Sequence, residues 1–579
     1  MPGRKPDWDL VRRTSAKVAK RMFDAFDRKR RNILTDIAYE FYPLGVAGLV
    51  RRAEAVADEC HYDEDHRLLT SRPLCALRNG ACGFKNHLTP NAGGWFRFHE
   101  AGGDGDVDSK TLDRLATAVE RAFSRSRAYD SLYKLYEHIL CFGFGCILVT
   151  RHPTQTVRVR TLRVGTYAME VNDDGEVCRI ARKFSWTAEQ IVRRFGDAGA
   201  PESVRKAAKD GDGERRWTVV NLVEPNASGD MRAYDRVARE LPLVDEMIYR
   251  SIYFIEGEKD CGPQGGILEA SGFSVKPIVA PRLDCELGDV YGRGRGADAL
   301  CIARGCQSFQ HDILRIDGRQ AEPPLVVSSE FKDQGFRAGR GGINYARFGE
   351  QRGALALPVF PQQIDTTPVR QDRVDAEAEI AELFFNSSFA AIDALKNNPG
   401  VKTATEVDAL VRENMEKLGP IVMNLERELL DPLVSAVAHY VVAECADPLE
   451  PEDVEAIGSV DVEYVSRLHM AANVQKVSTI DSWISRLAPL AEARPEVMDN
   501  VDADGVAKVY AEMLGVPAEA RADEEAVAAT RQQRAEMAKM QQEQARLTAL
   551  GNLAKVGSVP TDKDHLGGVI AQQGEETEQ

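Results

Sequence analysis

The chain has 579 residues with 74 basic and 90 acidic side chains, so its formal net charge is −16, and 43% of its residues are hydrophobic. This hydrophobic fraction can build substantial cores and argues against wholesale disorder, and the length suffices for several domains. The acidic balance argues against a tight nucleic-acid binder, which needs basic side chains to displace phosphate counterions. It is compatible with a protein that merely surrounds DNA.

The N-terminal half begins with helical patterns. Apolar residues at helical spacing predict helices over 12–60, 66–88 and 110–140, with a break at Pro43. Between the second and third lies a loop that ends in Trp95 and Phe96, two large side chains expected to anchor it on a core. The apolar run from Ile139 to Val149 is too short for a membrane span of roughly 20 residues and is predicted to be a buried core element.

Strand patterns follow from Cys146 to Val223 and from Met247 to Glu256. Asp174-Gly175 predicts a tight hairpin turn, because glycine readily adopts left-handed backbone angles. A short helix is expected over 187–195, and the polar stretch 196–213 is expected to be exposed. Helices and strands together predict an α+β fold that is predominantly helical.

The most unusual segment runs from Val290 to Lys402. A glycine-rich corner at 291–296 opens a helical pattern that ends near Asp317, and a second helical pattern runs from Gln371 to about Leu395. Between them lies a long irregular excursion. Loops longer than about 12–15 residues are uncommon unless they are functional or disordered, so this segment is predicted to project and contact a partner.

The C-terminal part begins with a capping box, in which Thr403 caps a helix and Glu406 reaches back to its first turn. Pro420 and Pro432 are expected to kink or split that helix. Short helices are predicted over 461–515, and a helix over 521–550 has only a weak apolar stripe, which suits an assembly better than a monomer core.

The sequence lacks several patterns that are typical of enzyme sites. The chain contains no P-loop pattern and no Gly-Lys pair, and the run Gly292, Gly294, Gly296 lacks the third spacing of a dinucleotide loop. These glycines are predicted to form a backbone corner. The eleven cysteines are scattered without a C-x-x-C pair and are predicted to be reduced core thiols. No catalytic residue, cofactor or metal site is predicted.

Several short segments, in order, resemble one known family. They are Leu88-Thr89-Pro90 with Trp95-Phe96, Phe142-Gly143-Phe144-Gly145, the Asp174-Gly175 hairpin, Pro281-Arg282 with Tyr291-Gly292-Arg293-Gly294, Pro323-Pro324, Thr403-Ala404-Thr405-Glu406, and Leu418-Gly419-Pro420 with Glu428-Leu429-Leu430 and Pro432-Leu433. Their order over about 15–440 resembles the portal proteins, or head-to-tail connectors, of short-tailed bacteriophages. The last 130 or so residues match only in character.

The resemblance implies a non-enzymatic subunit of a ring, usually of twelve copies, at one capsid vertex of the virion. Such a ring conducts double-stranded DNA during packaging and ejection, and its partners are the terminase motor, the major capsid protein and a tail adaptor or nozzle. Before assembly the protein is expected in the host cytoplasm, with no membrane partner and no cofactor. The resemblance divides the chain into a wing (1–290), a first stem helix (291–320), a clip (321–365), a second stem helix (366–395), a tunnel loop (396–402), wing and crown helices (403–520), a barrel helix (521–550) and a flexible tail (551–579).

Two groups of candidate contact residues follow from the resemblance. Lys396, Asn397, Asn398 and Lys402 of the tunnel loop would face DNA. Arg337, Arg340, Arg347 and Arg352 of the clip would contact neighbouring subunits or an acidic partner. The two lysines could equally be ordinary solvated loop residues, and acidic side chains between the arginines make salt bridges between subunits as plausible as DNA contact. A DNA-processing or phosphoryl-transfer enzyme of a phage gene cluster is the alternative function.

Overall fold

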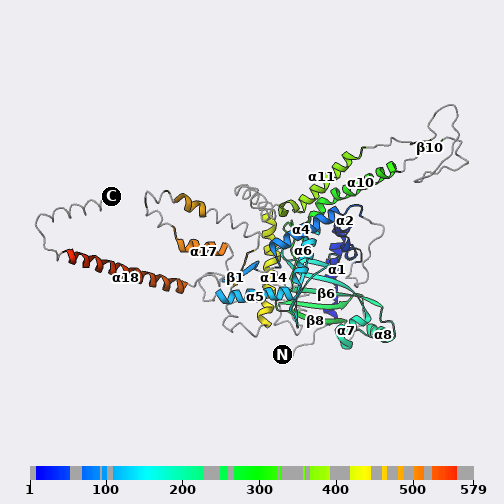
Figure 1. Ribbon diagram of the computed structural model, residues 1–579. Helices are drawn as coiled ribbons and strands as arrows, with labels where there is room; N and C mark the ends of the chain where they lie inside the picture. Colours follow the sequence, from blue (N-terminus) through cyan, green and yellow to red (C-terminus); the bar gives the residue numbers. More distant parts are fainter. Residues whose placement is uncertain are drawn as a thin grey trace, which may run out of the picture. The chain divides into compact units, whose positions relative to one another are not determined.

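The computed structural model describes residues 8–51, 68–91, 94–100, 109–225, 248–257, 266–321, 325–327, 356–358, 365–390, 418–444, 460–465, 480–487, 489, 494, 501–513 and 524–556. The chain divides into two compact units, Met1–Val501 and Asp502–Gln579. The expected predominantly helical α+β class is confirmed for the described residues (Figure 1).

Helices make up the N-terminal part of the first unit. Their bounds are α1 (Trp8–Lys29), α2 (Arg31–Phe41), the 3₁₀ turn η1 (Pro43–Gly45), α3 (Val46–Arg51), α4 (Arg72–Leu88), α5 (Ser109–Arg125) and α6 (Ala128–Phe142). The predicted break at Pro43 is confirmed, since proline opens the 3₁₀ turn. The expected helix over 110–140 is two helices, because Arg127 has a left-handed φ of 53° between them.

The described strands of the first unit form four separate antiparallel sheets. Their bounds are β1 (Phe96–Glu100), β2 (Ile147–His152), β3 (Thr156–Thr161), β4 (Tyr167–Val171), β5 (Val177–Thr187), β6 (Arg216–Pro225), β7 (Tyr249–Ile255), β8 (Ile267–Phe273), β9 (Ile278–Val279), β10 (Leu325–Val327), β11 (Ala356–Pro358) and β12 (Val460–Tyr464). The sheet orders are β4-β5-β6-β7-β8, β3-β2-β9, β1-β12 and β10-β11. The hairpin predicted at Asp174-Gly175 joins β4 to β5, and Gly175 has a φ of 81°.

The five-stranded sheet is buried on both faces. One face packs against α7 (Ala188–Gly199) and α8 (Glu202–Lys209), where Val219 and Ile191 belong to a small apolar cluster. Val220, the next residue of β6, belongs to the large core that the sheet shares with the N-terminal helices. Helix α8 lies in the stretch that was expected to be polar and exposed; its Val204 and Ala207 are buried.

Two long helices project from this body as a hairpin (Figure 1). They are α10 (Arg295–Ala321) and α11 (Thr367–Leu383), which lie side by side, and beyond them β10 pairs with β11. The register Leu325↔Pro358 brings together the two ends of the excursion that was expected to be a clip. The first helix therefore lies where the sequence predicted it, and most of the excursion, 328–355, lies outside the described residues.

Residues Leu418–Glu444 form a nearly continuous helical segment that contributes to the large core. It contains the π-helical turn η3 (Glu426–Leu430) and α14 (Asp431–Glu444). The break expected at Pro432 is a local widening of the helix, because η3 ends two residues before a proline that has no N–H to donate. Leu429, Leu433 and Val437 are fully buried.

The second unit contains α17 (Ala503–Met513) and α18 (Glu524–Val556). Arg531 of α18 forms two hydrogen bonds with Asp504 of α17, at 2.5 and 2.6 Å. From Ala529 to Leu547 every residue of α18 is exposed, including Met537, Met540 and Leu547. Helix α18 thus agrees with the predicted helix over 521–550 that lacks a strong apolar stripe.

Candidate functional site: the anchored base of a projecting hairpin

The glycine-rich corner is the joint between the body and α10. A side-chain carbon on Gly292, Gly294 or Gly296 would collide with backbone atoms of residues 141–143 or of Leu283. The same closeness allows Leu283 N–H to donate to Gly143 O at 2.7 Å and Arg293 N–H to donate to Leu283 O at 2.9 Å. The three glycines are therefore required by contact between two backbones, as the prediction of a backbone corner implied.

Tyr291 fixes the same corner from its other side. Its ring packs against Phe26 of α1 and Phe144, with ring centres 5.3 and 4.8 Å away. Its hydroxyl oxygen accepts a hydrogen bond from Met169 N–H of β4 at 2.9 Å. Burial raises the pKa of Tyr291 above its ordinary value, so the hydroxyl stays neutral. The corner is thus held by the first helix, the sheet and α6 together.

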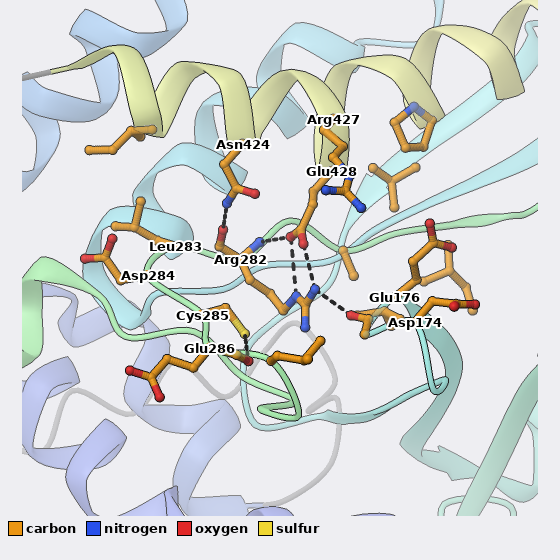
Figure 2. A pocket seen from close by; sticks show the side chains of 18 of the residues that line it. Asp174, Glu176, Arg282, Leu283, Asp284, Cys285, Glu286, Asn424, Arg427 and Glu428 are labelled. Atoms are coloured by element: carbon orange, nitrogen blue, oxygen red, sulfur yellow. Dashed lines mark hydrogen bonds and ion pairs between the residues drawn. The ribbon is translucent and has the colours of Figure 1, made fainter. Parts of the chain in front are cut away.

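Arg282, ten residues before Gly292, forms a largely buried ion pair with Glu428 (Figure 2). Arg282 Nη2 donates to Glu428 Oε1 at 2.6 Å and Nε donates to Oε2 at 3.3 Å. The backbone N–H of Arg282 also donates to Glu428 Oε2 at 2.8 Å. Burial alone would lower the pKa of Arg282, but the hydrogen bonds and negative charge of Glu428 raise it above its ordinary value.

The same guanidinium links two further segments. Nη2 donates to Gly175 O in the β4–β5 turn at 2.8 Å, and Nη1 donates to Asp289 O at 3.0 Å. Asn424 of the C-terminal helical segment donates from Nδ2 to Arg282 O (Figure 2). One side chain therefore ties the sheet, the loop that leads to α10 and the π-helical turn η3 to each other.

A pocket of about 500 Å³ surrounds this ion pair. Its lining carries both signs of charge: Glu176 and Glu286 are acidic, and Lys276 and Arg427 are basic. Burial raises the pKa of the Cys285 thiol in its wall, which disfavours the thiolate that a nucleophile requires. The charged side chains that line this pocket therefore hold chain segments together.

The base of α10 is fixed to the body by polar contacts. Gln307 Oε1 accepts from the N–H groups of Leu69 and Thr70, at 2.9 and 3.0 Å, and Gln307 Nε2 donates to Thr70 O at 3.1 Å. Arg304 pairs with Asp36 of α2 at 3.0 Å. Farther out, Arg370 of α11 pairs with Asp317 of α10 at 2.8 Å. These contacts hold the two helices to the body and to each other.

The second helix of the hairpin is interrupted within its predicted range. A helix reaching about Leu395 was expected; α11 ends at Leu383, Phe385 takes a left-handed φ of 61°, and residues 386–390 are helical again. Residues 391–395 lie outside the described part of the chain. The turn lets Phe384 bury completely against Phe41, with ring centres 5.4 Å apart, and lets Phe389 stack on His87 at 5.3 Å. Burying two aromatic rings offsets the strain of one non-glycine residue with positive φ.

None of the contact residues expected from the sequence falls in the described part of the chain. Lys396, Asn397, Asn398 and Lys402 lie outside it, as do Arg337, Arg340, Arg347 and Arg352 and the capping box at Thr403. Arg282 and Glu428 were not predicted to interact, because no sequence signal links positions 146 residues apart. Within the described residues no group of three or more His, Cys, Asp or Glu side chains could hold a metal ion, and no helix there is long and apolar enough to span a bilayer.

The model of the family described as "Bacteriophage head to tail connecting protein" matches residues 38–521. The chain belongs to this family. The matched range includes the glycine-rich corner, the hairpin and the Arg282–Glu428 pair. The predicted family is therefore confirmed, and the chain is a portal-type head-tail connector, a component of the phage virion.

Two curated relatives of this connector carry matching names. The "Probable portal protein" of Bordetella phage BPP-1 is 29% identical over 508 residues, which are 86% of this chain and 88% of the relative. The "Portal protein" of Salmonella phage epsilon15 is 26% identical over 452 residues, 77% of each chain. A chain from the solved "Virion of native gene transfer agent (GTA) particle" matches with 13% identity and a TM-score of 0.32, over 82% of this chain and 98% of that one.

Proposed function

We propose that the chain is one subunit of a closed ring, with twelve copies, at a single capsid vertex. The ring conducts double-stranded DNA during packaging and ejection, and it docks the terminase motor and later the tail adaptor or nozzle. The observation that carries this proposal is the family match over 38–521 together with the names of the two relatives. The role is structural rather than enzymatic, and the partner in the capsid is the major capsid protein.

The proposed division of labour follows the chain. The body, 1–290, is the wing, the hairpin of α10 and α11 is the stem, and 321–365 is the clip that meets the motor and adaptor. A tunnel loop at 396–402 brings Lys396 and Lys402 near the DNA, with Asn397 and Asn398 as neutral donors. Residues 403–520 add wing and crown, 521–550 form a barrel helix and 551–579 a flexible tail. The clip arginines Arg337, Arg340, Arg347 and Arg352 form contacts between subunits or with a partner.

The rigid base of the hairpin supports this proposal in physical terms. A stem that transmits load between a capsid and a motor needs a fixed angle to its body. The corner glycines, the Gln307 contacts and the buried Phe384 supply three independent attachments. Acidic net charge favours passage over retention of DNA, because few phosphates are neutralised and few counterions are released.

Electron microscopy of the purified protein tests the proposal most directly. Negative-stain images are expected to contain rings with a central hole, and mass measurement is expected to give about twelve subunits, the number that the family resemblance implies for such closed symmetric assemblies. A protein that stays monomeric at every salt concentration would overturn the proposal. Turnover in ATPase or nuclease assays with magnesium would instead favour the alternative of a DNA-processing or phosphoryl-transfer enzyme.

A further inference from the structure

The two helices of the hairpin carry opposite charge on their outer faces. Helix α10 contains four arginines and three aspartates, whereas α11 contains two arginines and five carboxylates. The charges are also ordered along each helix.

The exposed arginines of α10 lie on one stripe, which we call the basic face. It consists of Arg304, Arg315 and Arg319, all exposed and separated by 11 and 4 positions, so that they fall on the same side of a helix. His311 lies on the same stripe, and its ring is 3.4 Å from the adjacent Asp312 carboxylate at the edge of the stripe. Apart from Asp312, three positions before Arg315, no acidic side chain of α10 lies beside Arg315 and Arg319, so the outer half of the basic face stays net positive.

The exposed carboxylates of α11 form a matching stripe, which we call the acidic face. It consists of Asp372, Asp375, Glu379 and Glu382, all exposed and separated by 3, 4 and 3 positions. This spacing again places them on one side of the helix. No basic residue lies in α11 after Arg373, so the acidic face is uninterrupted along the helix.

The two faces point away from each other. The inner sides of the hairpin are marked by the Asp317–Arg370 pair, the Gln310–Arg373 hydrogen bond and the buried Ile313 and Ile380. At 100° per residue, the basic face lies roughly opposite the inner side of α10, and the acidic face roughly opposite the inner side of α11. The hairpin thus has a positive outer face on α10 and a negative outer face on α11, and the contacts between the two helices lie between these faces.

Most of these charges have no partner within the described residues. There, neither Arg315 nor Arg319 takes part in any ion pair, and the same holds for Asp372, Glu379 and Glu382. Asp375 accepts only a hydrogen bond from the neighbouring Gln371, at 2.8 Å. Arg304 is paired with Asp36, but both side chains are about half exposed, at 52% and 51%.

We propose that the occupant of each face is a second copy of this chain: the basic face of one hairpin docks against the acidic face of the next. Both halves of the contact are present on every subunit, but on different faces, so the contact is heterologous. Repeated heterologous contacts close into a ring when the rotation per subunit divides a full turn. The inference rests on the proposed ring and adds which surfaces join its subunits in the stem.

The contribution of these charges is to orientation and register more than to affinity. Exposed ion pairs are individually weak, and buried apolar area elsewhere between subunits must supply most of the association free energy. Complementary faces nevertheless favour head-to-tail contact and penalise two like faces in contact. A ring with one orientation of every subunit needs this kind of discrimination.

Charge reversal tests the inference in a way that separates electrostatic pairing from simple damage. One variant, Arg315→Glu with Arg319→Glu, makes both outer faces negative. A second, Asp375→Arg with Glu379→Arg and Glu382→Arg, makes both positive. A control, Lys206→Glu with Lys209→Glu, gives the first variant's charge change at exposed positions on α8, away from the hairpin. Assembly is measured by sedimentation and by negative-stain imaging at physiological salt.

Each single-face variant is expected to lose rings, while the control retains them. A 1:1 mixture of the two variants is expected to recover rings of alternating subunits, because every negative face then meets a positive one. The chain with both faces reversed is expected to recover them as well. Circular dichroism of each variant shows whether it is folded before mixing.

Three outcomes would overturn the inference. Rings in both single-face variants would mean that these faces point to the channel or the capsid and not to neighbours. Loss of rings that neither the mixture nor the doubly reversed chain repairs would mean that charge pairing is not their role. In either case, rings formed by the wild-type protein would leave the proposed function intact. The third outcome, a wild-type protein that forms no rings, would overturn both the proposed function and this inference.

Discussion

Arg282 and Glu428 lie 146 positions apart, and their side chains meet through hydrogen bonds of 2.6 and 3.3 Å at the base of the projecting hairpin. The arginine side chain is 7% exposed and the glutamate 21%. Because the carboxylate lies in the π-helical turn η3, the widened turn and the ion pair belong to one arrangement. This pair links the C-terminal helical segment to the loop that enters α10.

Glu428→Ala should destabilise the body by about 2–4 kcal/mol, because it leaves the Arg282 guanidinium buried without its counter-charge. Urea unfolding followed by circular dichroism measures the change. Arg427→Ala is the matched control, since Arg427 is the exposed neighbour on the same turn and should change stability by less than about 0.5 kcal/mol. Replacing both partners, as in Arg282→Met with Glu428→Leu, should recover part of the loss. Equal effects of Glu428→Ala and Arg427→Ala would show that the pair does not stabilise the fold.

Glycines of the corner and of the stem should respond in opposite directions to the same substitution. Gly294→Ala places a methyl group against the backbone of Cys141 and Gly143, which cannot move aside, and should cost about 3 kcal/mol or more. Gly318→Ala places it in open space on helical backbone and should stabilise by about 0.5–1 kcal/mol. Thermal unfolding of the two variants is the comparison. A tolerated Gly294→Ala would mean that the corner is looser than its contacts imply.

His138 should make the body sensitive to acid. Its ring lies between Tyr42 and Phe142, and its Nδ1 has no hydrogen-bond partner among the described residues. Burial first, and then the charges of Lys134 and Arg163, lower the pKa of His138 to about 3. The unfolded chain takes up this proton near pH 6.5, so stability is complete above that value and falls as pH drops toward 3.

At pH 4.5 this single group should cost about 2–3 kcal/mol relative to neutral pH, at roughly 1.4 kcal/mol per pH unit. Unfolding free energies measured between pH 7 and 4.5 for wild type and His138→Leu give the contribution as a difference, which cancels the carboxylates common to both. His99→Leu, at an exposed position, should keep the wild-type profile. An unchanged pH dependence in His138→Leu would show that this imidazole does not drive the acid sensitivity.

Local sequence patterns predicted the helices and strands of this fold more reliably than the places where they end and contact each other. Helical spacing in the sequence predicts one apolar stripe, and four of its six members are buried while Phe309 and Ile316 are half-buried; the buried four are Leu300, Ala303, Cys306 and Ile313. The Asp174-Gly175 turn and the buried Trp95 and Phe96 were also predicted correctly, since turn chemistry and large apolar side chains act locally. In contrast, the end of α11 at Leu383 depends on where Phe384 and Phe389 find their partners on α2 and α4. These partners lie about 300 positions away in the sequence, so no periodic pattern near Leu383 indicates them.

In the candidate site, too, local features could be predicted from the sequence and long-range contacts could not. The corner glycines could be assigned to a backbone bend because few other uses fit a G-x-G-x-G run without phosphate-loop spacing. Arg282 and Glu428 both stand in segments that carry the family resemblance, but nothing in either segment indicates the other as a partner. Spacing in the sequence is enough to place the charges of each helix on one side. That the two charged sides point away from each other follows only from the contacts between α10 and α11.

Reversing the charge of the tunnel loop should impair DNA handling without preventing assembly. Under the proposed function, Lys396 and Lys402 approach the phosphates within the roughly 8 Å over which charges act at physiological salt, and transient attraction guides the DNA. In Lys396→Glu with Lys402→Glu, each subunit instead repels the duplex, so packaged or retained DNA should fall several-fold. The measurement is DNA content of particles made by a phage that lacks its own copy of the gene and is supplied with the variant. Lys206→Glu with Lys209→Glu makes the same change of charge on α8 and should package normally, and negative-stain images should contain rings for both variants. If the loop variant packages as well as this control does, the two lysines are ordinary solvated residues and the loop does not guide DNA.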